Sequence, residues 1–250
     1  MENDYNNIFE IKKKRKFSKI FFIFVVLLII VTGVYLVCTH IILPSSNNHY
    51  DVYRSQDGYY AVVLGENDDY QKLEAMYGSV VALGASGYIW QGGDTSYIIA
   101  LIYPTEDMAK SVVASNSIDM HIQKFETKQI AFNLDNFSPN EIDTIAQAIN
   151  FVYDMGKVLY ELTISIQLGG ISTIAGASAV NTHKGQILAN IATIQSYLND
   201  KSSDNVNYYV AKMIKASNIL EKLVNQLLTN QDESNAIKYC MCEYIYELCN

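Results

Sequence analysis

The longest uninterrupted apolar stretch of the chain runs from Ile20 to Thr39 and contains no charged side chain. A helix of about 20 apolar residues is long enough to cross the hydrocarbon core of a bilayer. Six basic residues stand in front of it at positions 12–16 and 19, and the next basic residue is Arg54, so the basic flank is expected on the cytoplasmic side. The pattern predicts a basic cytoplasmic tail over residues 1–19 and a transmembrane helix over residues 20–43, with all later residues outside.

A cleaved signal peptide is the alternative interpretation of this stretch. The stretch is longer than the apolar region of a usual signal peptide, and no small-x-small cleavage site follows it between Thr39 and Ser45. We therefore expect a retained single-pass anchor. Residues 44–57 are polar and short of hydrophobic side chains, which is typical of a tether.

The alternation of apolar and polar positions changes period several times between residues 58 and 126. Strand-like stretches at 59–65, 86–91, 95–103 and 119–125 are separated by helix-like stretches at 69–83 and 105–116. The order is strand, helix, strand, strand, helix, strand. It predicts a split βαβ (βαββαβ) sandwich, in which two helices cover one face of a single sheet.

The remaining residues, 138–250, favour a helical bundle. Ser138-Pro139-Asn140-Glu141 combines a capping box with Pro at the first helical position. Apolar residues then recur at three- and four-residue spacing in several stretches joined by short polar connections, which makes neighbouring helices antiparallel. The stretch from Leu162 to Thr182 carries no charge, but its polar and glycine residues favour a buried segment over a second membrane span.

The region of residues 58–126 resembles the sporulation-related repeat (SPOR) domain of bacterial envelope proteins. The resemblance rests on the aromatic strand that ends in Leu64-Gly65, the corner Leu83-Gly84-Ala85-Ser86-Gly87, and the second half from Tyr97 through Pro104 to Ala109. It implies binding to peptidoglycan glycan strands through the sheet face, in sporulation or cell division, and a location at the bacterial cytoplasmic membrane. The chain departs from the family's pattern at Val63 and Tyr97, where the family commonly has Gln and Arg.

Period-two alternation assigns the residues that would make this glycan surface. One face of the sheet carries Tyr60, Val62, Leu64, Ile98, Ala100 and Ile102 toward the two helices, and the other face carries the candidate glycan-binding aromatics Tyr59, Tyr88, Trp90, Tyr97 and Tyr103. The second face also holds Val63, Ile99 and Leu101, which offer no group to sugar hydroxyls. The alternative interpretation is therefore that the helical bundle, or a second copy of the chain in a homo-oligomer, covers this apolar face.

Charge and cysteine content limit the remaining classes of function. The chain has 18 Lys and Arg and 26 Asp and Glu, of which six and three precede residue 44, so the remainder carries a formal charge of −11. Such a surface repels phosphate backbones, so we expect no nucleic-acid partner. Cys240, Cys242 and Cys249 lack the paired spacing of a structural zinc site, which leaves a disulfide or buried thiols.

No convergent set of catalytic residues is recognisable in the sequence. The four histidines have no metal-ligand spacing, and no nucleophile elbow, phosphate-binding loop or dinucleotide fingerprint occurs. We expect no cofactor and no catalytic or metal site. The sequence thus predicts an α+β protein with an N-terminal transmembrane helix, a SPOR-like sandwich and a C-terminal bundle. Two non-enzymatic functions remain: glycan binding, or a scaffold that binds envelope proteins.

Overall fold

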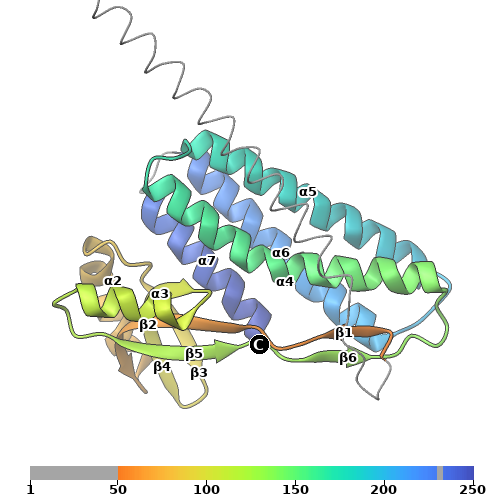
Figure 1. The fold of residues 1–250 in the computed structure, drawn as a ribbon, viewed down its shortest axis with the longest axis horizontal. Helices are drawn as coiled ribbons and strands as arrows, with labels where there is room; N and C mark the ends of the chain where they lie inside the picture. The colour runs from red at the N-terminus through yellow and green to blue at the C-terminus, as the bar shows by residue number, and fades with distance from the viewer. Residues whose placement is uncertain (1–49, 230–232) are drawn as a thin grey trace, which may run out of the picture. The chain divides into compact units, whose positions relative to one another are not determined.

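The structure is a computed structural model, and it describes residues 50–229 and 233–250. Residues 50–250 form one compact unit. Within the described residues the fold is α+β, with six helices and two small sheets. Figure 1 shows the four long helices gathered on one side of the strands.

The larger sheet has four strands and two short helices. Its elements follow the order β2 (Gly58–Asn67), α2 (Tyr70–Ala82), β3 (Tyr88–Gly92), β4 (Thr95–Tyr103), α3 (Glu106–Ser115) and β5 (His121–Glu126). The strands lie side by side as β3-β4-β2-β5, and every neighbouring pair is antiparallel. The side chains of Asp69 and Thr105 cap the two helices by accepting hydrogen bonds from Gln71 and Met108 amides.

A second, two-stranded sheet was absent from the sequence prediction. β1 (Val52–Arg54) pairs with β6 (Ile130–Phe132) in antiparallel register, and Val52 lies opposite Phe132. The prediction of a simple tether over residues 44–57 is therefore wrong for its last part. The strand residues Val52, Ile130 and Phe132 are buried in the main core, so the pair joins both ends of the sheet region to the helices.

Four helices complete the unit: α4 (Pro139–Gln167), α5 (Thr173–Leu198), α6 (Asp204–Leu228) and α7 (Glu233–Cys249). α4 begins at the predicted capping residues, where the Glu141 carboxylate accepts hydrogen bonds from the Ser138 amide and hydroxyl. Lys201, in the connection before α6, donates to the same carboxylate. Together these donors, with Lys201 first, lower the pKa of Glu141 to about 2.

Different helices pack on the two faces of the four-stranded sheet. Leu64, Ile89, Ile98 and Ala100 pack with Leu73 and Val80 of α2 in a small separate core. The opposite face belongs to the main core that also contains the buried side chains of α4, α5, α6 and α7. α7 lies directly against β3 and β4, as its position above the sheet in Figure 1 illustrates.

The predicted fold class, a transmembrane helix followed by a sandwich and a separate bundle, is wrong for the residues that the structure describes. In residues 50–229 and 233–250 no helix is long and apolar enough to cross a membrane. The stretch 20–43, for which the transmembrane helix was predicted, lies outside the described residues. The sheet and the helices also share one core instead of standing as successive modules, because an apolar sheet face of this size must be buried against something. The predicted membrane location depends on residues 1–49 and stays a prediction.

Candidate functional site

The structure buries four of the five predicted glycan-binding aromatics. Tyr59, Tyr88, Trp90 and Tyr103 are at most 9% exposed, and only Tyr97 is half-buried. Their neighbours come from the long helices, since Tyr103 contacts Tyr160 of α4, Tyr88 contacts Tyr239 and Tyr246 of α7, and Trp90 contacts Tyr246. The four buried side chains therefore form no open glycan platform. Register shifts in β2 at Val62/Val63 and Val63/Gly65 also interrupt the simple alternation from which the faces were predicted.

A closed cluster of aromatic rings packs the sheet face against α7. Trp90 on β3 stacks on Phe125 of β5, with ring centroids 3.8 Å apart, although these strands lie on opposite edges of the sheet. The sheet therefore curls around its inner face. The edge of Tyr246 closes the cluster at a centroid distance of 5.0 Å from Trp90. Favourable edge-to-face and offset ring contacts add to the apolar area that is buried here.

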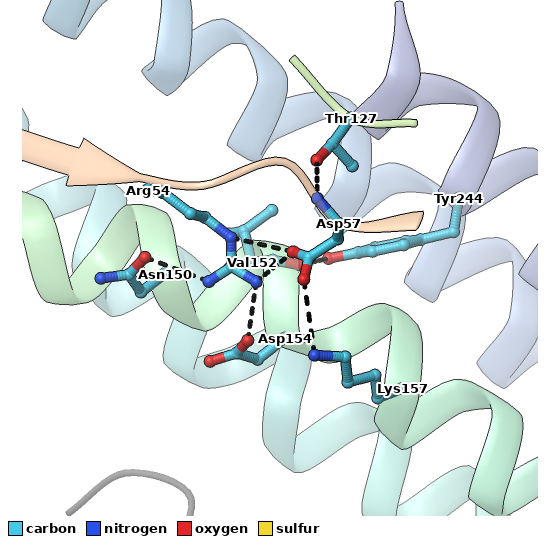
Figure 2. A network of polar contacts seen from close by, with 8 residues as sticks. All are labelled: Arg54, Asp57, Thr127, Asn150, Val152, Asp154, Lys157 and Tyr244. Atoms are coloured by element: carbon cyan, nitrogen blue, oxygen red, sulfur yellow. Dashed lines mark hydrogen bonds and ion pairs between the residues drawn. The ribbon is translucent and has the colours of Figure 1, made fainter. Parts of the chain in front are cut away.

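A polar network fixes the start of the described chain to α4 (Figure 2). The Arg54 guanidinium donates to Asp57, Asp154 and Asn150, with Nη2 at 2.9 Å from the Asp154 carboxylate. Burial lowers the pKa of Arg54, but Asp154 and Asp57 more than offset this effect and raise it overall. Lys157 adds a second cation at 3.5 Å from Asp57. The network is internally balanced in charge, and its role is to anchor β1.

A cleft that opens toward solvent lies elsewhere, between α2, the C-terminal end of α6 and the N-terminal part of α7. This tyrosine cleft has a volume of about 620 Å³. Its walls carry three tyrosines, Tyr70 and Tyr77 from α2 and Tyr239 from α7, and its floor is the corner Ser86-Gly87 with Ile89. The remaining lining residues are Glu74, Val81, Lys222, Gln226, Asn235 and Ala236. Its size lies within the range of about 300–1,000 Å³ that is usual for ligand sites.

Gly87 determines the shape of the cleft floor. Its φ is +69°, a conformation that L side chains rarely adopt. A Cβ atom at this position would stand 2.8 Å from the Tyr77 ring and 2.8 Å from Val81. Only glycine therefore allows the Tyr77 ring to lie against the backbone here.

Three polar side chains of the cleft already have hydrogen-bond or ion-pair partners within the protein, and a fourth, Glu74, forms no ion pair among the described residues. Lys222 forms an ion pair with Glu243 at 2.8 Å and stands 4.8 Å from the centre of the Tyr239 ring. The Gln226 side-chain oxygen accepts from the Cys240 thiol, and the Asn235 amide donates to the Val81 carbonyl. Glu74 is exposed and forms no ion pair within the described residues.

The pKa of Tyr239 is raised above its ordinary value. Burial raises this pKa, Lys222 lowers it, and Glu243 and the hydroxyl groups of Tyr70 and Tyr77 raise it further. Sequence reasoning missed the cleft because Tyr239 comes from the far end of the chain. The spacing of Tyr70, Glu74 and Tyr77, which places them on one face of α2, was the only signal available.

The three C-terminal cysteines are free thiols, of which Cys240 and Cys242 are buried and Cys249 is partly buried. The sequence had left open a disulfide or buried thiols. Cys240, Cys242 and Cys249 are free, and burial raises the pKa of each to about 12. A protonated, buried thiol is a poor nucleophile and a poor metal ligand. Within residues 50–229 and 233–250 no three His, Cys, Asp or Glu side chains gather closely enough to hold a metal ion.

Comparison with protein-family models, with curated proteins and with solved structures gives no match. The resemblance to the SPOR domain therefore stays a prediction from the sequence.

Proposed function

We propose that this protein is a non-enzymatic interaction scaffold, in which the four-stranded sheet is a structural element and the outer surface of the folded unit binds a partner protein. The observation that carries the proposal is the burial of the sheet face under α4 and α7. Glycan binding at this face would require the helices to leave it. Fully burying one large apolar side chain contributes about 1.5–3 kcal/mol, so exposing several of them at once is strongly unfavourable.

The chemistry of the described residues supports a non-enzymatic role. The buried thiols are held in their protonated form, and the partly buried Arg54 is paired with Asp57 and Asp154. The cleft between α2, α6 and α7 is instead lined by three tyrosines. Tyrosines are enriched at protein-binding surfaces because they provide a large and rigid contact area with a polar end.

A comparison of two binding assays tests this proposal on the full-length protein. In the first assay the protein is sedimented with purified peptidoglycan glycan strands, and we expect it to stay in the supernatant. In the second, a photo-crosslinking amino acid replaces Tyr77 in the producing cells, with the same replacement at Tyr208 as the control. These two side chains are 45% and 46% exposed, but only Tyr77 lines the cleft.

The scaffold proposal expects a discrete protein adduct from position 77 and none from position 208. Saturable sedimentation with glycan strands, together with the absence of a protein adduct at position 77, would contradict it and favour the glycan-binding function that the sequence resemblance implies.

A further inference from the structure

We propose that the tyrosine cleft binds an extended, proline-containing peptide segment that carries a basic residue; this inference rests on the scaffold function proposed above. The cleft brings together three aromatic rings, one unpaired carboxylate and a rigid floor, and each of these features restricts the chemistry of the ligand.

The aromatic walls are accessible and pre-formed. Tyr70 and Tyr77 are 43% and 45% exposed, which is unusual for large aromatic side chains on one face of a short helix. The Tyr77 ring is held against Gly87, and Tyr239 is held between Lys222 and Tyr88. The rings of Tyr77 and Tyr239 are therefore already positioned before a ligand enters, so little of their side-chain entropy is lost on binding.

The charges of the cleft disfavour an anionic ligand. Lys222 is the only basic residue among the described residues that line the cleft, and this ammonium group is already paired with Glu243 and placed on the Tyr239 ring. The Glu74 carboxylate would repel a phosphate or a second carboxylate. The formal charge of the whole chain is −8, which adds a weak attraction for a basic partner.

The hydrogen-bonding groups favour a peptide over a sugar. Recognition of a sugar by its hydroxyl groups needs several side-chain donors and acceptors in the site. Here the Gln226 oxygen accepts from Cys240 and the Asn235 amide donates to Val81. The groups that remain are the tyrosine rings, their hydroxyl groups and Glu74, so ring contact must supply most of the affinity.

Polyproline II segments match this combination. They have no internal hydrogen bonds, they are stiff before binding, and aromatic-lined grooves recognise them through contacts between proline rings and aromatic rings. Tyrosine hydroxyl groups can donate to the exposed carbonyl groups of such a backbone. Glu74 lies on the same α2 face as Tyr70 and Tyr77, which places a carboxylate next to the rings for a Lys or Arg side chain of the ligand.

A peptide array provides the test. Full-length protein is applied to heptamers in which two prolines are separated by two residues and an Arg stands at one end. Each heptamer is paired with a version in which alanine replaces both prolines and with another in which glutamine replaces the Arg. We expect a subset of proline heptamers to bind and both counterparts to bind more weakly. Solution titrations of the best heptamer then measure its dissociation constant.

Substitutions inside the cleft, each paired with a control outside it, test whether the heptamer binds in the cleft. Tyr77→Ala is expected to weaken binding by about tenfold or more, as for a central aromatic contact, whereas Tyr208→Ala on α6 is expected to leave it unchanged. Glu74→Gln should weaken binding of the Arg heptamer but not of its glutamine counterpart. Glu161→Gln, at an exposed acid of α4, serves as the charge control. Circular dichroism checks that all four variants are folded.

Three results would overturn the inference: no preference for proline heptamers over their alanine counterparts, equal loss in Tyr77→Ala and Tyr208→Ala, or displacement of a bound heptamer by glycan fragments at the same site. The scaffold function would survive the first two results if photo-crosslinking at position 77 still captured a protein. It would fail together with the inference only if glycan strands bound and no protein did.

Discussion

Replacing Leu101 by Asp is expected to unfold the whole unit of residues 50–250, helices included. Leu101 is 6% exposed and lies on the sheet face that shares its core with α4–α7. The change removes an apolar contribution of about 1.5–3 kcal/mol and places an unpaired carboxylate in the core, which costs several kcal/mol more. Folded proteins are stable by only about 5–15 kcal/mol, so the loss is a large fraction of the total.

The measurement follows helix content by circular dichroism during urea denaturation, together with limited proteolysis of the long helices. Leu168→Asp is the matched control, because Leu168 is 81% exposed at the end of α4 and should tolerate the same change. A Leu101→Asp protein whose helices unfold at the wild-type urea concentration would show that the sheet and the bundle are independent, contrary to the shared core.

The second large effect is expected where Gly156 of α4 lies against Tyr59 of the sheet. A Cβ atom on Gly156 would stand 2.7 Å from the Tyr59 hydroxyl oxygen, and Tyr59 is fully buried. Gly156→Ala should therefore destabilise the protein by about 1–3 kcal/mol through overpacking. Gly185→Ala on α5 is the control. A Cβ at that position would meet no heavy atom within 4 Å beyond the neighbouring backbone of its own helix, so the better helix propensity of Ala should stabilise the protein by about 1 kcal/mol.

A second substitution, Tyr59→Phe, is expected to restore the stability that Gly156→Ala removes. The Tyr59 hydroxyl group is buried and has no hydrogen-bond partner among the described residues, and burial raises its pKa. Tyr59→Phe should therefore cost no stability, because it removes a polar group that was desolvated without compensation. The double variant with Gly156→Ala should recover most of the lost stability. Strict additivity of the two changes in urea denaturation would contradict the contact between the hydroxyl group and α4.

Local sequence signals predicted most of the individual elements. Capping residues and hydrophobic periodicity placed α2, α3 and the start of α4 within a few residues, because these signals depend on neighbours in the chain. The pair of β1 and β6 was missed, since each strand has only three residues and Val52 meets Phe132 across 80 positions. The bridge from Lys201 to Glu141 is equally non-local. Nothing in either short segment indicates its partner.

The candidate site was harder to predict than the fold. The sequence pattern directed attention to aromatics on the outer sheet face, but alternation determines only which side chains share a face and not what covers that face. Tyr88 and Trp90 became core residues because α7 packs on them. Tyr70 and Tyr77 lie on the exposed face of α2, and they line a cleft only because Tyr239, from the far end of the chain, lies beside them.

Fluorescence of Trp90 tests the central claim, that the long helices cover the sheet face, most directly. It is the only tryptophan in the chain, and its side chain is 3% exposed beneath Tyr246. A reference variant that combines Trp90→Phe with Leu168→Trp places a single tryptophan at an exposed position. The account predicts that native Trp90 emits at shorter wavelength than this reference and is several-fold less sensitive to acrylamide quenching. Equal quenching of the two proteins in their folded state would show that the sheet face is open to solvent and would contradict the account.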